Sequence, residues 1–201
     1  MSTRAHHGVH VTRGDTTTSP HPRPPLPALS AAVREVYAHA RASYPNECCG
    51  YLWCEDDLPR VVACQNAAQD PANAGARRHG FAFAAPDRVA FAKRLDAAGF
   101  AIVYHSHPDV GAFASARDLA AMEALGSAVW HLIVDVRQRQ TLGARLFAVS
   151  PPPQAQTDQL FARHAMLKPH EVARFTAHGD PASGPWRDPI GSPLPPSAYR
   201  T

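Results

Sequence analysis

Short apolar segments alternate with helix-like segments through the middle of the chain, and this order restricts the folds that it can adopt. The apolar runs are CCGYLWC, RVVACQN, FAIVYHSHP, WHLIVDV and ARLFAVS, each the length of one strand. Strands that alternate with helices are typical of a layered domain in which helices cover a sheet. We therefore expect a layered α/β fold built around one sheet.

The first half of this pattern predicts a helix followed by a β-hairpin. The helix is expected over Ser30–Arg41, with Ser30 as its cap and Pro45 beyond its end. Its apolar positions recur at helical spacing: Leu29, Val33, Val36 and Ala40. The runs CCGYLWC and RVVACQN, separated by the polar turn EDDLP, predict the hairpin.

The second half predicts two further helices between strands. A short strand is expected near Phe81–Ala84, and a helix opens at Pro86 and Asp87 and ends at Gly99. The buried face of that helix is expected to carry Val89, Phe91 or Ala92, and Leu95. Pro108 should end the strand FAIVYHSHP, and a third helix is expected from Ser115 to Leu125.

Proline-rich segments at both ends set the predicted domain limits. Residues 1–25 are expected to form a disordered arm that bears prolines and histidines, and residues 26–150 to form the domain. Residues 151–201 are expected to hold a C-terminal helix, within QTDQLFARHAMLKPHEVARF and broken near Pro169. A proline-rich extended tail follows it, draped on the domain through Trp186.

Charge and cysteine content narrow the functional classes. The formal net charge is +3 and no long run of Lys and Arg occurs, so we expect neither nucleic acid nor a membrane as a partner. The N-terminus has no apolar core of a secretory signal, which predicts a cytoplasmic protein. The four cysteines, at 48, 49, 54 and 64, are then expected to be reduced. Their spacing matches no CxxC pair, so we interpret them as small buried side chains rather than as a second zinc site.

One stretch, YHSHPDVGAFASARD at residues 104–118, could carry chemistry. His105 and His107 are two residues apart on a predicted strand, so both side chains point to one face. Ser115 and Asp118 stand at a predicted helix start. Two histidines and one carboxylate leave the fourth position of zinc open for water, as in catalytic sites. The same residues also fit a bland interpretation, namely a half-buried strand followed by a capped helix.

The combination resembles the signature of the JAMM (MPN-plus) metalloproteases. The matching residues are His-x-His-Pro from His105, then Ser-x-x-Asp from Ser115 after a further six residues, and the upstream Pro-x-Glu-x-Cys-Gly at residues 45–50. The resemblance runs from about residue 28 to 149 and includes Asn66 and FAFAAPD. One departure is Phe113-Ala114, where many relatives have a proline before the serine.

This resemblance implies a fold, a metal and a reaction. The fold would be a mixed, largely antiparallel sheet flanked by helices (α+β), with cytidine-deaminase-like architecture. His105, His107 and Asp118 would bind one Zn²⁺, Glu47 would be the general base, and Ser115 would stabilise the tetrahedral intermediate. The bond cleaved would be a peptide or isopeptide bond. His79 and His131 are interpreted as ordinary surface or core histidines.

The short connections after Asn66 and after the helix at Ser115 indicate a prokaryotic member of the family. Its expected substrate is the C-terminus of a ubiquitin-like or sulfur-carrier β-grasp protein, and the oligomeric state is not indicated. An alternative is a non-catalytic MPN-type binding scaffold, which loss of one of the five site residues would mark; all five are present.

Two further alternatives fit less well. A zinc nucleobase deaminase would need His-x-Glu and Pro-Cys-x-x-Cys, and the sequence has neither. Phage-tail members of the family carry a second, thiol-dependent hydrolase domain, and no cysteine follows Cys64. We therefore do not expect that second domain here.

Overall fold

A computed structural model describes residues 26–55, 58–69, 75–150 and 168–183 of the chain. The predicted arm at 1–25, the predicted helical segment before residue 168 and Trp186 lie outside these residues. The elements run in this order: α1 (Leu26–Ser43), β1 (Cys49–Glu55), β2 (Leu58–Cys64), η1 (Ala76–Arg78), α2 (Ala85–Ala98), β3 (Ala101–Pro108), α3 (Ala116–Leu125), β4 (Val129–Arg137), β5 (Gln140–Ser150) and β6 (Lys168–Phe175).

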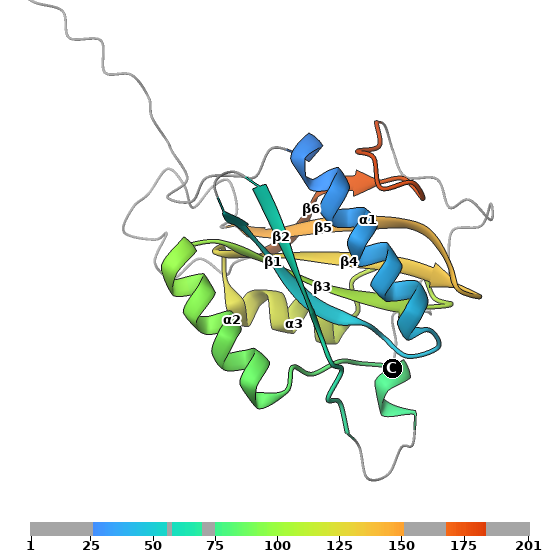
Figure 1. Ribbon diagram of the computed structural model, residues 1–201, viewed down its shortest axis with the longest axis horizontal. Helices are drawn as coiled ribbons and strands as arrows, with labels where there is room; N and C mark the ends of the chain where they lie inside the picture. The colour runs from blue at the N-terminus through green and yellow to red at the C-terminus, as the bar shows by residue number, and fades with distance from the viewer. Residues whose placement is uncertain (1–25, 56–57, 70–74, 151–167, 184–201) are drawn as a thin grey trace, which may run out of the picture.

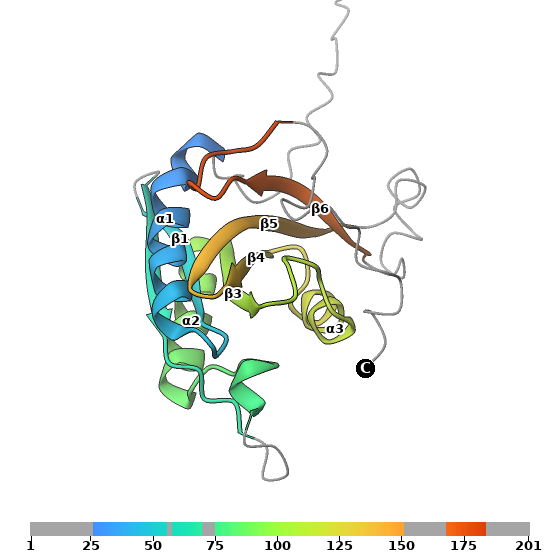
Figure 2. The ribbon, with the colours of Figure 1, turned by 90° about the vertical axis from the view of Figure 1, so that its right-hand side faces the viewer.

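The six strands form one mixed sheet in the order β2-β1-β3-β4-β5-β6 (Figure 1). Only β3 and β4 pair in parallel, and every other neighbouring pair is antiparallel. Helix α1 covers one face of the sheet, while α2 and α3 lie on the other (Figure 2). This confirms the predicted α+β class and the largely antiparallel sheet.

The central strand β3 is buried along its whole length, from Ala101 to Pro108. It lies between β1 and β4, and helices cover both of its faces, so its apolar run is continuous rather than alternating. Ile102 and Tyr104 face α1, whereas Val103 packs with Phe91 of α2. The face opposite α1 therefore receives His105 and His107.

Helix α1 begins four residues earlier than predicted, at Leu26, so the prediction that Ser30 caps it is wrong. Pro27 falls in the first turn, where a missing N–H costs nothing because no intrahelical acceptor faces it. Ser30 is instead a buried residue of the helix. The predicted apolar face is confirmed, since Leu29, Val33 and Val36 are at most 2% exposed.

Helix α2 ends as predicted at Gly99, whose φ of 68° is the left-handed conformation that glycine adopts most easily. Its predicted buried face is wrong at Val89 but confirmed at Phe91 and, as a half-buried residue, at Leu95. Phe91 is buried, but Val89 is 55% exposed and Ala92 is exposed as well. Phe91 packs on the Tyr51 ring, with ring centroids 5.2 Å apart, and Leu95 packs against the same cluster.

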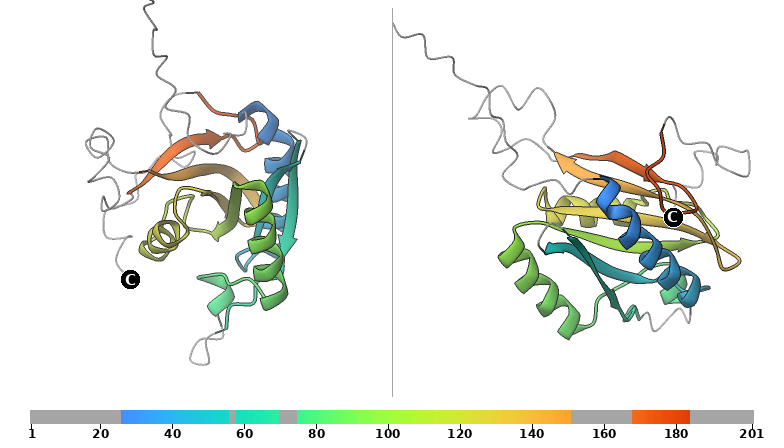
Figure 3. Two further views of the ribbon diagram at one scale, coloured as in Figure 1. Left: turned by 90° about the vertical axis from the view of Figure 1, so that its left-hand side faces the viewer. Right: turned by 45° about the horizontal axis from the view of Figure 1, so that its top comes forward.

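Two predicted elements differ from the structure. The strand expected near Phe81–Ala84 is a single bridge between Asn66 and Phe83. The segment Lys168–Phe175, expected to be helical, is the edge strand β6 and buries Phe175 in the core beneath α1. The pairing of this segment with the free edge of β5 outweighs its local helical pattern. Pro169 is tolerated because the outer side of an edge strand leaves N–H groups unpaired. Figure 3 shows β6 at the rim of the sheet.

Candidate metal centre

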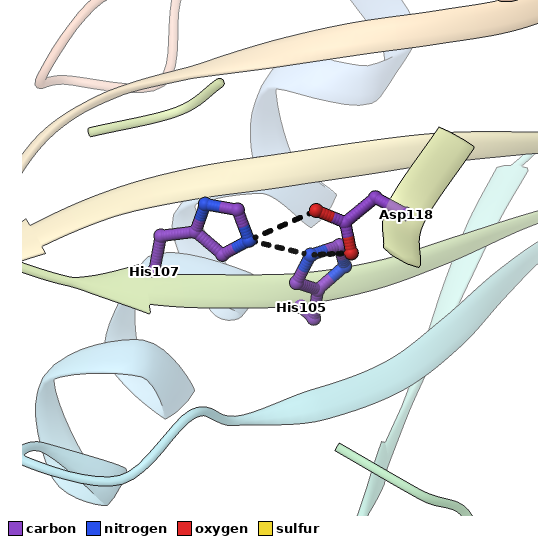
Figure 4. A group of neighbouring side chains, drawn as sticks. All are labelled: His105, His107 and Asp118. Carbon is purple, nitrogen blue, oxygen red and sulfur yellow. Dashed lines mark hydrogen bonds and ion pairs between the residues drawn. The ribbon is translucent and has the colours of Figure 1, made fainter. Parts of the chain in front are cut away.

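Two of the predicted ligands stand at the end of β3. His105 and His107 lie on the same face of the strand and are 1% and 7% exposed. Their Nε2 atoms are 2.9 Å apart, and the His105 ring stacks on Phe81 with centroids 4.7 Å apart. Both imidazoles are therefore buried, with one nitrogen each turned to a common point (Figure 4).

The third predicted ligand comes from the first turn of α3. Asp118 is 7% exposed, and its Oδ1 and Oδ2 lie 3.2 Å from His105 Nε2 and 3.4 Å from His107 Nε2 (Figure 4). Ser115 caps the helix, since its Oγ accepts from the Asp118 N–H at 3.2 Å and its own N–H donates to Asp118 Oδ2 at 2.7 Å. The helix start and the candidate metal group thus share one carboxylate.

These three side chains fit a metal ion. Their ligand atoms lie within 4.8 Å of one another, in the only such group of three or more His, Cys, Asp or Glu among the described residues. Ligand atoms around tetrahedral zinc lie about 3.3 Å apart, given bonds of about 2.0–2.1 Å. The observed separations of 2.9, 3.2 and 3.4 Å bracket that value. Two imidazole nitrogens and a carboxylate are also a donor set that zinc accepts.

The protonation states follow from burial and from these contacts. Burial lowers the pKa of His105 and outweighs the effect of Asp118. Burial also lowers the pKa of His107, but the hydrogen bond and charge of Asp118 raise it above its usual value. Burial would raise the pKa of Asp118, yet the hydrogen bonds from both histidines hold it well below its usual range. The Asp118 carboxyl is therefore ionised at neutral pH. Its negative charge, next to two imidazoles, suits the binding of a cation.

The loop between β3 and α3 holds the second nitrogen of His107. His107 Nδ1 lies 3.1 Å from the carbonyl oxygen of Gly111, so Nδ1 carries the proton and Nε2 presents its lone pair to the site. Gly111 has a φ of 94°, and a Cβ there would lie 2.9 Å from the Phe113 ring. The guanidinium of Arg145 lies 4.5 Å from the centroid of that ring. Phe113, one of the two residues at which the chain departs from the family pattern, therefore supports this loop through its ring.

Glu47 is also buried beside the group, at 6% exposure. Burial raises the pKa of its carboxyl to about 8; the charge of His107 opposes this rise, and that of Asp118 adds to it. The pairing of Cys49 with His105 brings the start of β1 next to the end of β3. Gly50 has no room for a side chain, because a Cβ would lie 2.2 Å from the Val62 carbonyl oxygen and 2.5 Å from the Tyr104 hydroxyl.

Asn66 ties the Glu47 segment to the opposite wall of the site. Its Nδ2 donates to the carbonyl oxygens of Glu47 and Gly80, both at 3.0 Å. Its Oδ1 accepts from the N–H groups of Ala68 at 2.9 Å and Ala82 at 3.3 Å. The sequence included Asn66 in the family resemblance but did not predict this bridging role. No local pattern predicts hydrogen bonds between Asn66 and segments 14 to 19 residues away.

A cavity of about 910 Å³ opens at the site. The side chains of Glu47, His107, Ser115 and Asp118 line it, as do His79 and His131. His79 is exposed and His131 is a core residue, as expected, but both belong to the walls of this cavity. Cys48, Cys49 and Cys64 are buried, which agrees with the predicted small core side chains, whereas Cys54 is only half-buried.

A family model described as prokaryotic homologs of the JAB domain matches residues 29–148. The chain belongs to this family. The JAB domain thus covers the sheet through β5 and contains all five predicted site residues. The resemblance to JAMM/MPN proteins is confirmed.

Among relatives, the chain is similar to the tail tip assembly protein K of Escherichia phage N15. The two are 30% identical over 101 residues, which is 50% of this chain and 37% of that protein. Two solution structures, of proteins from Desulfitobacterium hafniense and Salinibacter ruber, are 22% and 25% identical, with TM-scores of 0.43 and 0.40. The matches cover 69% and 71% of this chain and 84% and 85% of those chains. No helix among the described residues of the JAB-domain chain is both long and apolar enough to cross a membrane.

Proposed function

We propose that this protein is a zinc-dependent hydrolase of peptide or isopeptide bonds. The observation that carries the proposal is the buried Glu47 carboxyl in the same cavity as the group of His105, His107 and Asp118. A carboxyl whose pKa is raised to about 8 can gain and lose a proton near neutral pH, which is what a general base and acid must do.

Each side chain has a role in this proposal. His105, His107 and Asp118 would hold the ion. Zinc in that place supplies Lewis-acid chemistry, since it makes water more acidic and polarises a carbonyl group. Glu47 takes the proton of the attacking water and passes it to the leaving amine. Ser115 Oγ accepts from the Asp118 N–H, so its own hydrogen is available for the oxygen on which charge develops.

The substrate that we propose is the C-terminus of a ubiquitin-like or sulfur-carrier β-grasp protein. A cavity of about 910 Å³ beside the ligand group is large enough to take an extended chain end.

The first test measures the zinc content per chain of wild type, His107→Ala and Glu47→Gln. Residues 1–25 are removed from all three proteins, because that segment bears four of the twelve histidines. About one zinc in wild type and Glu47→Gln, and none in His107→Ala, supports the site.

The second test uses a β-grasp protein ending in Gly-Gly, either extended by a short peptide or joined to a lysine side chain. Mass spectrometry should find cleavage after Gly-Gly by the zinc-loaded wild type and none by Glu47→Gln. Zinc binding without cleavage of either probe would reject this substrate class. Equal binding of the probe by wild type and Glu47→Gln without turnover would favour the non-catalytic scaffold.

The similarity to a phage tail tip assembly protein favours a second candidate, a role in assembling a tail-like particle. The match covers 37% of that relative, so it bears on one part of it. A stable complex between this chain and a tail protein, unaffected by Glu47→Gln, would support that role over hydrolysis.

A further inference from the structure

The two histidine ligands differ in how their second nitrogens are satisfied. His107 Nδ1 has the carbonyl oxygen of Gly111 as its partner at 3.1 Å. His105 Nδ1 is buried and has no hydrogen-bond partner among the residues that the structure describes. A histidine that offers Nε2 to a metal carries its proton on Nδ1, and that N–H almost always donates to an acceptor that fixes the ring. None of the described residues provides this acceptor for His105.

A second buried ring nitrogen without a partner lies close by. His131 is 2% exposed, and its Nε2 has no hydrogen-bond partner within residues 26–55, 58–69, 75–150 and 168–183. It stands on β4, opposite Val103 of the parallel strand β3, and His105 is two residues further along β3 on the same face. Side chains that are diagonal neighbours on adjacent strands are within reach of one another when they are long or aromatic.

The charge state of His131 suits an acceptor. Burial lowers the pKa of His131 to about 4, and the charge of His105 lowers it further, against the opposite effect of Asp118. The imidazole is therefore neutral at neutral pH and keeps one lone pair. With the proton on Nδ1, that lone pair is on Nε2, the atom that lacks a partner.

We propose that His131 is a positioning residue for the metal ligand His105, accepting the Nδ1–H of His105 at its Nε2 across one bridging water molecule. The pairing removes two buried, unpaired nitrogens at once. It also fixes the His105 ring with Nε2 toward Asp118, as Gly111 fixes the ring of His107. The proposal rests on the metal site of the proposed function.

The variants that test it keep or remove the acceptor. His131→Phe keeps a ring but has no nitrogen, and His131→Gln offers an amide oxygen in its place. Phe91→Leu is the matched control, because Phe91 lines the same cavity and is also buried, yet holds no polar atom. Zinc affinity is measured on metal-free protein by competition with a chromophoric chelator, and the visible spectrum is recorded after loading with Co²⁺.

We expect zinc affinity to fall about 10–100-fold in His131→Phe, the usual effect of losing such a partner. His131→Gln should recover most of it, and Phe91→Leu should bind zinc as wild type does. The Co²⁺ spectrum should shift in His131→Phe alone. Wild-type affinity and an unchanged spectrum in His131→Phe would overturn the positioning role while leaving the metal site intact, whereas absence of zinc from the wild type would reject both.

A measurement on the wild type keeps the test independent of how the variants fold. In zinc-loaded protein with ¹⁵N-labelled histidine, NMR should find His105 protonated at Nδ1 and His131 unprotonated at Nε2. A proton on Nε2 of His131 would leave it unable to accept, and would overturn the proposal.

Discussion

Ser115 and Asp118 hold each other through two hydrogen bonds that also set the candidate metal centre. The Ser115 N–H donates to Asp118 Oδ2 at 2.7 Å, and the same oxygen lies 3.4 Å from His107 Nε2. The start of α3 and the ligand geometry are therefore one arrangement. A capping box is usually a device for helix stability, but here it also orients a carboxylate toward two imidazoles.

This relationship predicts that mutation can separate two roles, the capping of α3 by the Ser115 hydroxyl and the binding of metal by the Asp118 carboxylate. Ser115→Ala should lower the free energy of unfolding by about 1 kcal/mol, because the Asp118 N–H loses its acceptor, and should retain zinc. Asp118→Asn should retain much of the cap but lose zinc, since the negative charge is gone. Denaturant unfolding of metal-free protein and zinc content measure the two effects. Ser127→Ala, at an exposed serine beyond α3, is the control and should change neither. Loss of zinc from Ser115→Ala would contradict this separation.

The buried carboxyl of Glu47 predicts a pH dependence of stability in the metal-free protein. Its pKa is about 8 in the folded state against 4.5 for the free group, so the folded state keeps a proton that the unfolded chain releases. The protonated Glu47 carboxyl therefore leaves the free energy of unfolding at its full value below about pH 4.5. That free energy falls as the pH rises from 4.5 toward 8, because only the unfolded chain loses the proton. Glu47→Gln lacks this loss, so urea unfolding should show wild type falling relative to the variant by a few kcal/mol, as an order of magnitude. Parallel stability curves from pH 5 to 8 would contradict the prediction.

Gly111 predicts a link between a backbone conformation and metal binding. Gly111→Ala should cost about 1 kcal/mol or more through its positive φ, and more through contact with Phe113. It should also weaken zinc binding, because the carbonyl that orients His107 moves. Gly126→Ala is a matched control, with a φ of 72° and no atom of a described residue within 4 Å of the added Cβ. It should lower the unfolding midpoint but bind zinc as wild type does. Equal zinc affinities in the two variants would show that the conformation of the Gly111 loop does not affect metal binding.

Asn66 predicts a loss of turnover without loss of metal. Asn66→Ala leaves the carbonyl oxygens of Glu47 and Gly80 without their donor, at about 1–3 kcal/mol for a buried polar group left unpaired. Asn66→Asp should be worse, because it places a carboxylate against these oxygens. Both should bind zinc, because Asn66 is not part of the group of His105, His107 and Asp118, and both should hydrolyse less because Glu47 is displaced. Zinc content and hydrolysis are measured on the same samples, and full turnover by Asn66→Ala would exclude this role.

The local features of the site could be predicted from the sequence because they depend on short-range geometry. Residues two apart on a strand share a face, so His105 and His107 had to point together. Ser115 and Asp118 are three apart at a helix start, so each can reach the backbone of the other. The continuous apolar run around them required a central strand. These relations hold whatever the rest of the chain does.

Other features depended on which segments came to lie side by side. The antiparallel pairing of β1 with β3 places Glu47 near His107, 60 positions along the chain, and the parallel pairing of β3 with β4 places His131 opposite Val103, two residues before His105. Lys168–Phe175 became a strand because the edge of β5 was open, and Val89 stayed exposed because α2 touches the sheet chiefly through Phe91. Pairing and burial between distant segments supply more free energy than local propensity, so only the tertiary structure decided these positions.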